Sequence, residues 1–173
     1  MTFRFPSWVS FVALLFVAGC GYTQKTVLPD NIKTIYVETV TNKIPVNEIY
    51  AYVPRLEIQI TNAIIRQLNR DGTLKVVPKE QADAVFKASM IGFLQEGVRF
   101  TSLESVEEYQ LFVILSMKLI DNKSKRVIWQ EPNFSGDAYY FVSQFPSLSR
   151  DEAAQRAINR LGENVVDRIV EDW

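Results

Sequence analysis

The chain has 173 residues, 47% of them hydrophobic and 23% charged, which suits one domain with a buried core and argues against a disordered chain. A formal net charge of -1 provides no overall attraction for nucleic acid, so no nucleic-acid partner is expected. No His and a single Cys exclude imidazole-based catalytic groups, an internal disulfide and a Cys-rich metal site, so we expect no enzyme, no cofactor and no metal.

The N-terminal segment is typical of a bacterial lipoprotein signal peptide. Arg4 precedes an apolar run at residues 8–17, which is too short to span a bilayer. The tetrapeptide Val17-Ala18-Gly19-Cys20 then resembles a lipobox, which implies cleavage before Cys20 and acylation of that residue. The alternatives are an ordinary signal peptide with a chance Cys, or a buried N-terminal helix.

A lipid anchor at Cys20 also predicts a location. Two or more acyl chains hold a protein stably on a membrane. In lipoproteins that are retained in the inner membrane, the residue after the lipidated Cys is typically an Asp. This chain has Gly21 there, so we expect the protein to be anchored in the outer membrane and to face the periplasm. The predicted division is a signal peptide at residues 1–19, the lipidated Cys and a tether at 20–31, and one domain at 32–173.

The first half of that domain predicts a strand, a helix and a short strand. Residues 32–41 are rich in β-branched side chains and predict a strand, and residues 42–52 predict a loop. Pro54 suits the first turn of a helix whose apolar residues recur at helical spacing up to Asp71-Gly72. A short strand is expected at residues 74–77.

The second half predicts three longer strands and a final helix. Strands are expected at residues 82–94, 109–121 and 126–140, with a polar connection at 97–108, a hairpin turn at 122–125, and a break in the last strand near Pro132 or Gly136. Ser149 and Glu152 fit a capping box that opens a helix over about residues 150–171.

These elements predict an α+β fold. Two helices with one apolar stripe each would pack on a mostly antiparallel four-stranded sheet, a two-layer sandwich in the order β-α-β-β-β-α. Val85, Phe112 and Ile114 on the other sheet face would need partial cover from loops or a partner.

The chain resembles the LptE family of LPS-assembly lipoproteins. The resemblance rests on Cys20-Gly21-Tyr22, on the order of strands and helices, and on the segment at residues 82–88, which looks like the turn into the family's second long strand. It implies a protein that plugs the outer-membrane β-barrel LptD, assists its assembly and contacts lipopolysaccharide. It implies no catalytic residues.

Two groups of residues are candidates for such contacts. Lys123, Lys125 and Arg126 in the hairpin turn could pair with lipopolysaccharide phosphates, or could form an ordinary solvated turn. Aromatic residues are enriched at protein interfaces, so a partner-binding site is expected after the last strand, although the same residues could be core. This second group comprises Tyr139, Tyr140, Phe141 and Phe145. The segment Val98-Arg99-Phe100 is a weaker candidate.

A second interpretation remains open. A periplasmic adaptor lipoprotein of another envelope or secretion complex, similar to CsgG-type proteins or the N-terminal domain of TolB, would also combine a short tether with mixed strands and helices. A ring-shaped oligomer would favour this alternative, and a one-to-one complex with a barrel would favour the LptE interpretation.

Overall fold

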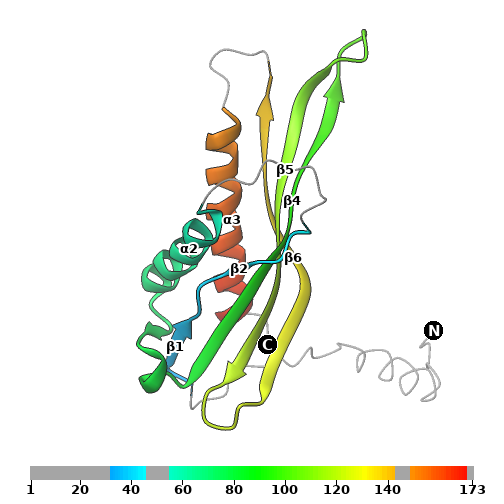
Figure 1. Ribbon diagram of the computed structural model, residues 1–173. Helices are drawn as coiled ribbons and strands as arrows, with labels where there is room; N and C mark the ends of the chain where they lie inside the picture. Colours follow the sequence, from blue (N-terminus) through cyan, green and yellow to red (C-terminus); the bar gives the residue numbers. More distant parts are fainter. Residues whose placement is uncertain (1–31, 46–54, 143–148, 171–173) are drawn as a thin grey trace, which may run out of the picture.

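The computed structural model describes residues 32–45, 55–142 and 149–170. A six-stranded sheet forms one layer, and the helices α2 (Leu56–Asp71) and α3 (Arg150–Val170) cover one of its faces (Figure 1). The predicted α+β two-layer class is confirmed, although the sheet has six strands and the sequence predicts four. The strands are β1 (Thr34–Val37), β2 (Thr41–Asn42), β3 (Lys75–Val76), β4 (Ala84–Phe100), β5 (Val106–Asp121) and β6 (Val127–Phe141), with a 3₁₀ turn η1 (Lys79–Gln81) between β3 and β4.

The three long strands form an antiparallel meander. The order across the sheet is β3-β1-β4-β5-β6, and β2 pairs with β4 further along the same strand. The pairs of β1 with β3 and β4, and of β2 with β4, are parallel. The single strand predicted at residues 32–41 is divided, because the Val40 N–H leaves the sheet and donates to Thr61 Oγ1 of α2 at 3.0 Å.

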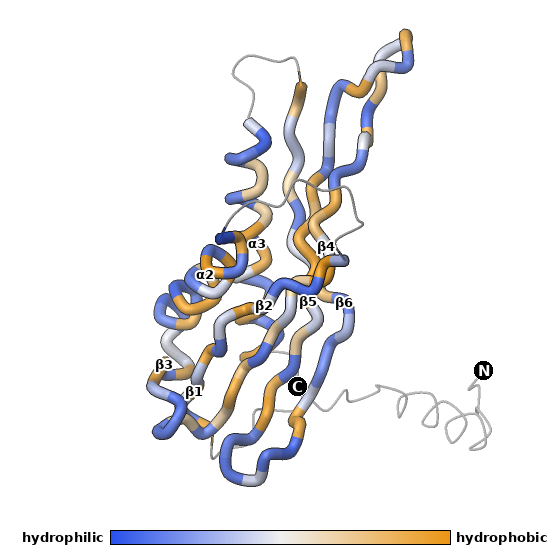
Figure 2. Tube along the Cα trace, viewed as in Figure 1, coloured by the Kyte–Doolittle hydropathy of each residue, from blue (hydrophilic) through white to orange (hydrophobic). Residues whose placement is uncertain are grey.

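The core lies between the sheet and the helices. Alternate residues of β5 point into it, and hydrophobic and hydrophilic residues alternate along the long strands (Figure 2). Each helix contributes one stripe, as the spacing predicts. Fully buried members include Phe86 and Met90 of β4, Leu111, Leu115 and Leu119 of β5, Ile60, Ile64 and Leu68 of α2, and Ile158 and Leu161 of α3.

The end of α2 and the start of α3 lie where the sequence predicts them. Gly72 takes a left-handed conformation (φ 78°), and its N–H donates to the Leu68 carbonyl at 3.0 Å, which closes α2. At the start of α3, the Ser149 N–H donates to Glu152 Oε2 at 2.8 Å and the Glu152 N–H donates to Ser149 Oγ at 3.2 Å. The predicted capping box is therefore confirmed, and its hydrogen bonds hold the pKa of Glu152 below its usual value.

The polar connection predicted at residues 97–108 is wrong. β4 continues to Phe100 and β5 starts at Val106, so most of this segment is a hairpin that extends beyond both helices (Figure 1). Cross-strand contacts stabilise it, including an ion pair of 3.3 Å from Arg99 Nε to Glu108 Oε2. Without a helix to pack against, these strands need no apolar face, which explains why their sequence reads as polar.

The last strand is continuous through both predicted break points. Pro132 and Asn133 together lie opposite Ser116, so the proline is accommodated in a β-bulge rather than at a break. Gly136 pairs with Val113 in regular register. Because Gly136 has no side chain, α3 can approach the sheet closely at this position.

Candidate functional site

Exposed hydrophobic residues gather at one end of the molecule. Seven large hydrophobic side chains are strongly exposed in the described part of the chain, and five of them lie where the β4–β5 hairpin and the end of β6 project. Leu103, in the hairpin turn, is 86% exposed and Phe100 is 56% exposed. We call this group the apolar end; it comprises Val98, Phe100, Leu103, Tyr139 and Val142.

The hairpin turn that carries Leu103 is held by hydrogen bonds. Thr101 Oγ1 accepts from the N–H groups of Leu103 at 3.3 Å and Ser105 at 3.2 Å. The Thr101 N–H donates to the Ser105 carbonyl at 2.8 Å, and Glu104 takes a left-handed conformation with φ 60°. The turn therefore presents Leu103 to its surroundings in a defined conformation. A group of exposed hydrophobic side chains of this kind often marks an interaction surface.

The partner-binding residues predicted on β6 lie on two different faces of the sheet, because side chains alternate along a strand. Tyr140 points to the helix side, is buried, and stacks on Tyr109 with 5.5 Å between ring centroids. Burial also raises the pKa of Tyr140. Tyr139 and Phe141 are on the opposite face, where Tyr139 is 46% exposed and the Arg99 guanidinium lies 5.4 Å from the Phe141 ring centroid. Phe145 lies outside the described residues.

The predicted basic residues lie in the turn between β5 and β6. The Asp121 carboxylate organises this turn by accepting from the N–H groups of Ser124 and Lys123, and these bonds, that of Ser124 first, lower the pKa of Asp121. Lys123 Nζ lies 3.3 Å from Asp83 Oδ1, and Lys125 Nζ donates to Asn122 Oδ1 at 2.8 Å. Arg126 is exposed. The positive charge of the turn is therefore partly compensated by Asp83 and Asp121.

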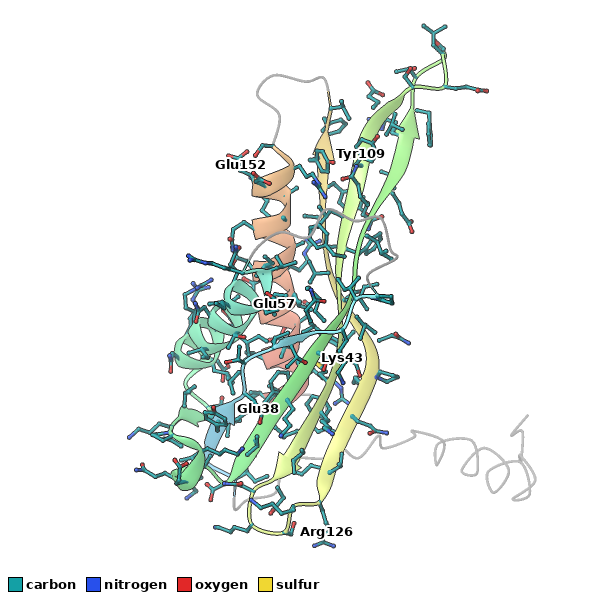
Figure 3. The ribbon with its side chains drawn as sticks, in the orientation of Figure 1. Glu38, Lys43, Glu57, Tyr109, Arg126 and Glu152 are labelled. Carbon is teal, nitrogen blue, oxygen red and sulfur yellow. The ribbon has the colours of Figure 1, made fainter. Side chains whose placement is uncertain are left out.

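The two predicted sites are at opposite ends of the sheet. β6 has 15 residues and begins next to the basic turn, and it ends at Tyr139, Tyr140 and Phe141. At the usual rise per residue the strand is about 45–50 Å long. Figure 3 shows this separation, with Arg126 at one end of the sheet and Tyr109 toward the other. One small ligand cannot contact both sites at once.

Asp83 joins the start of the domain to the basic turn. Its Oδ2 accepts from the Thr34 hydroxyl at 2.8 Å and from the N–H groups of Lys33 and Thr34 at 3.2 Å each. Its carbonyl accepts from the Asn122 N–H at 2.7 Å. Residues 32–34 therefore lie beside the β5–β6 turn. The Thr34 hydroxyl first, and then the Lys33 N–H and Lys123, hold the pKa of Asp83 below its ordinary value of 3.8.

Acid is expected to weaken this junction. Because the folded pKa of Asp83 is lowered, its stabilising contribution is complete above the unfolded pKa and is lost as the pH falls through the folded pKa. Asp83→Asn should therefore lower the urea midpoint at about pH 7, and the difference from wild type should shrink toward about pH 3. A difference that is the same at both pH values would contradict a role for the carboxylate charge.

The described residues contain neither a metal centre nor a membrane-spanning helix. Groups of His, Cys, Asp or Glu that could hold a metal ion are absent among them. Neither α2 nor α3 is sufficiently long and apolar to cross a bilayer. The lipidation site predicted at Cys20, with its signal peptide and tether, lies outside the described residues.

The face of the sheet away from the helices has no helical cover in the part of the chain that the structure describes (Figure 1). Val85 is nonetheless buried there, and Phe112 and Ile114 are half-buried. Polar and apolar side chains mix on this face, since Lys87, Ser116 and Lys118 alternate with core residues on the same strands. This open face is a surface on which a ligand or partner could lie.

A family model shows the family of this chain, and solved structures show its fold. A family model described as LptE: Lipopolysaccharide-assembly matches residues 32–173. A protein from Xanthomonas campestris described as DUF330 is similar in structure, with 11% identity, a TM-score of 0.59, and coverage of 83% of this chain and 89% of that one. A hypothetical protein from Chlamydia trachomatis has 15% identity, a TM-score of 0.54, and coverage of 80% and 95%. At these identities the two structures support the fold alone. None of the curated proteins matches this chain in sequence.

Proposed function

This chain belongs to the LptE family of lipopolysaccharide-assembly proteins, and we propose that it is an outer-membrane lipoprotein that plugs an LptD-like β-barrel and assists the assembly and transport of lipopolysaccharide. The family match over residues 32–173 is the observation that carries the proposal. The apolar end supports it, because a domain that binds a partner needs exposed hydrophobic and aromatic side chains at the contact. The proposal assigns no catalytic residue and no cofactor.

The test is affinity purification of the lipidated protein from membranes. The tagged full chain is extracted in mild detergent, and the proteins recovered with it are identified by mass spectrometry. The proposal expects one large outer-membrane barrel in a one-to-one complex. Recovery without any such barrel would contradict it, and a ring of identical copies would favour the alternative of an adaptor in another envelope or secretion complex.

We propose that the basic turn faces the membrane that holds the anchor. Residue 32 lies beside this turn through the Asp83 hydrogen bonds, and a tether over residues 20–31 reaches about 40 Å at most. Lys123, Lys125 and Arg126 would then lie near lipopolysaccharide phosphates. Each basic residue close to an anionic membrane surface contributes about 1 kcal/mol, less where a carboxylate such as Asp83 already pairs with it.

Substitution of the anchor residue is expected to abolish acylation. Cys20→Ala removes the thiol that would carry the lipid, so the variant should lack acyl chains. Mass spectrometry of the mature N-terminus checks both proteins. An unmodified N-terminus on the native protein would contradict the lipoprotein assignment.

A further inference from the structure

A polar hollow lies on the open face of the sheet, near its middle. Its volume is about 330 Å³, within the range of small-ligand sites. Figure 3 shows Lys43 near the middle of the sheet, between Tyr109 toward one end and Arg126 at the other. The polar side chains of the open face that line the hollow are Lys43, Lys87, Lys118, Ser89, Ser116 and Gln130.

Strand register forces two of these lysines together. Lys87 of β4 is the direct cross-strand partner of Lys118 of β5, and Ser89 pairs in the same way with Ser116. Directly opposed like charges destabilise a sheet. Lys43 follows β2 and is held against β4 by its N–H, which donates to the Met90 carbonyl at 2.8 Å. Three separate segments therefore bring ammonium groups to one hollow.

The nearby carboxylates leave an excess of positive charge. Glu38 Oε2 lies 2.9 Å from Lys87 Nζ, and Glu131 is paired with Arg168 at 3.0 Å. Within the described residues, no carboxylate oxygen is within 4.0 Å of the ammonium group of Lys43 or Lys118. Two lysine charges thus remain uncompensated beside the two serine hydroxyls.

We infer that this hollow binds a phosphate group carried by a glycolipid. Ammonium groups suit phosphate as compact charged donors, and serine hydroxyls add neutral donors to its remaining oxygens. A bound phosphate would also relieve the repulsion between Lys87 and Lys118. The inference deepens the proposed function and rests on it for the choice of lipopolysaccharide as the phosphate carrier. Free phosphate offers the same chemistry.

The test measures binding of the full chain to phosphatidylcholine vesicles that contain lipopolysaccharide. Lys118→Gln should weaken binding about tenfold, and Lys43→Gln with Lys118→Gln about a hundredfold. Lys75→Gln, which removes an equal charge from an exposed position on β3, is the matched control and should change affinity less than about twofold. Dephosphorylated lipopolysaccharide should bind wild type as weakly as intact lipopolysaccharide binds the double variant.

Inorganic phosphate identifies the source of the ligand. If millimolar inorganic phosphate displaces the protein from the vesicles, the site binds phosphate and free phosphate is a sufficient ligand. If vesicle binding persists, the site requires the phosphate to be carried by the glycolipid. Unchanged affinity of the double variant, or equal binding of dephosphorylated lipopolysaccharide, would overturn the inference.

Two further readouts separate this inference from misfolding and from the proposed function. Because Lys118→Gln removes a like-charge contact, its Tm without ligand should equal or exceed that of wild type; a lower Tm would contradict the opposed-lysine geometry. Recovery of the barrel tests the proposed function independently. If a lysine variant recovers the barrel normally but binds phosphorylated lipid less tightly than wild type does, the phosphate site is supported. If it recovers the barrel and binds the lipid like wild type, the phosphate site is overturned and the proposed function is not.

Discussion

Replacing Gly136 with alanine is expected to lower the free energy of unfolding by about 3 kcal/mol. A Cβ atom at this position would lie 2.6 Å from the Ala157 carbonyl oxygen, the Leu161 N and the Leu161 Cβ. Non-bonded carbon atoms prefer about 3.5–4.0 Å, so α3 would have to retreat by about 1 Å. The first two of these contacts are with helix backbone, which cannot move aside by changing a rotamer.

The loss would spread through the core because α3 contributes much of it. Ala157, Ile158 and Leu161 are fully buried on the helix surface that faces β6 and β5. A retreat of the helix opens space beside each of them, and poorly filled space in a core costs stability. We therefore expect the unfolding midpoint to fall by about 10 °C for a domain of this size.

Gly92→Ala is the matched control for this prediction. Gly92 is also a strand glycine, but its added Cβ would meet Ile114 Cδ1 at 3.1 Å, the far end of a flexible side chain. We expect a loss below about 1 kcal/mol, because that side chain can shift. Urea denaturation of both variants checks the pair, and equal losses would contradict the close approach of α3 at Gly136.

Gly136 also illustrates what the sequence could and could not predict. Alternation along β5, the apolar stripes of the helices, the Gly72 stop and the Ser149–Glu152 capping box are local patterns, and each of them predicted its element. From the sequence alone Gly136 indicates a possible strand break, because a glycine weakens a strand. The structural reason for a glycine at this position is that α3 crosses the strand there. That crossing depends on packing between segments that are distant in the chain.

The polar hairpin and the hollow were missed for a similar reason. Strands that project beyond the helices have no core to enforce alternation, so residues 97–108 carry no strand signal. The hollow depends on register, since Lys87 and Lys118 meet only when β4 and β5 pair as they do, and Lys43 joins them through a two-residue parallel strand. A pairing of segments this far apart has no signature in a single sequence.

Replacing the two most exposed residues of the apolar end is expected to abolish recovery of the barrel. Phe100→Ser combined with Leu103→Ser removes large side chains that a partner would bury, and hot-spot residues of this kind contribute about 2 kcal/mol or more each. We expect affinity to fall by at least about a hundredfold. Neither residue is in the core, so the fold and its thermal midpoint should be unchanged.

Two equally simple substitutions serve as controls, because they remove exposed apolar surface elsewhere. Val127 is 49% exposed and begins β6 beside the basic turn, and Ile58 is 50% exposed on α2. If the partner binds through the apolar end, Val127→Ser and Ile58→Ser should recover the barrel like wild type. If instead all four positions weaken recovery alike, the barrel surrounds the domain without preference for one end. Full recovery by the double variant would remove the apolar end from the interface and leave the open sheet face as the surface to test next.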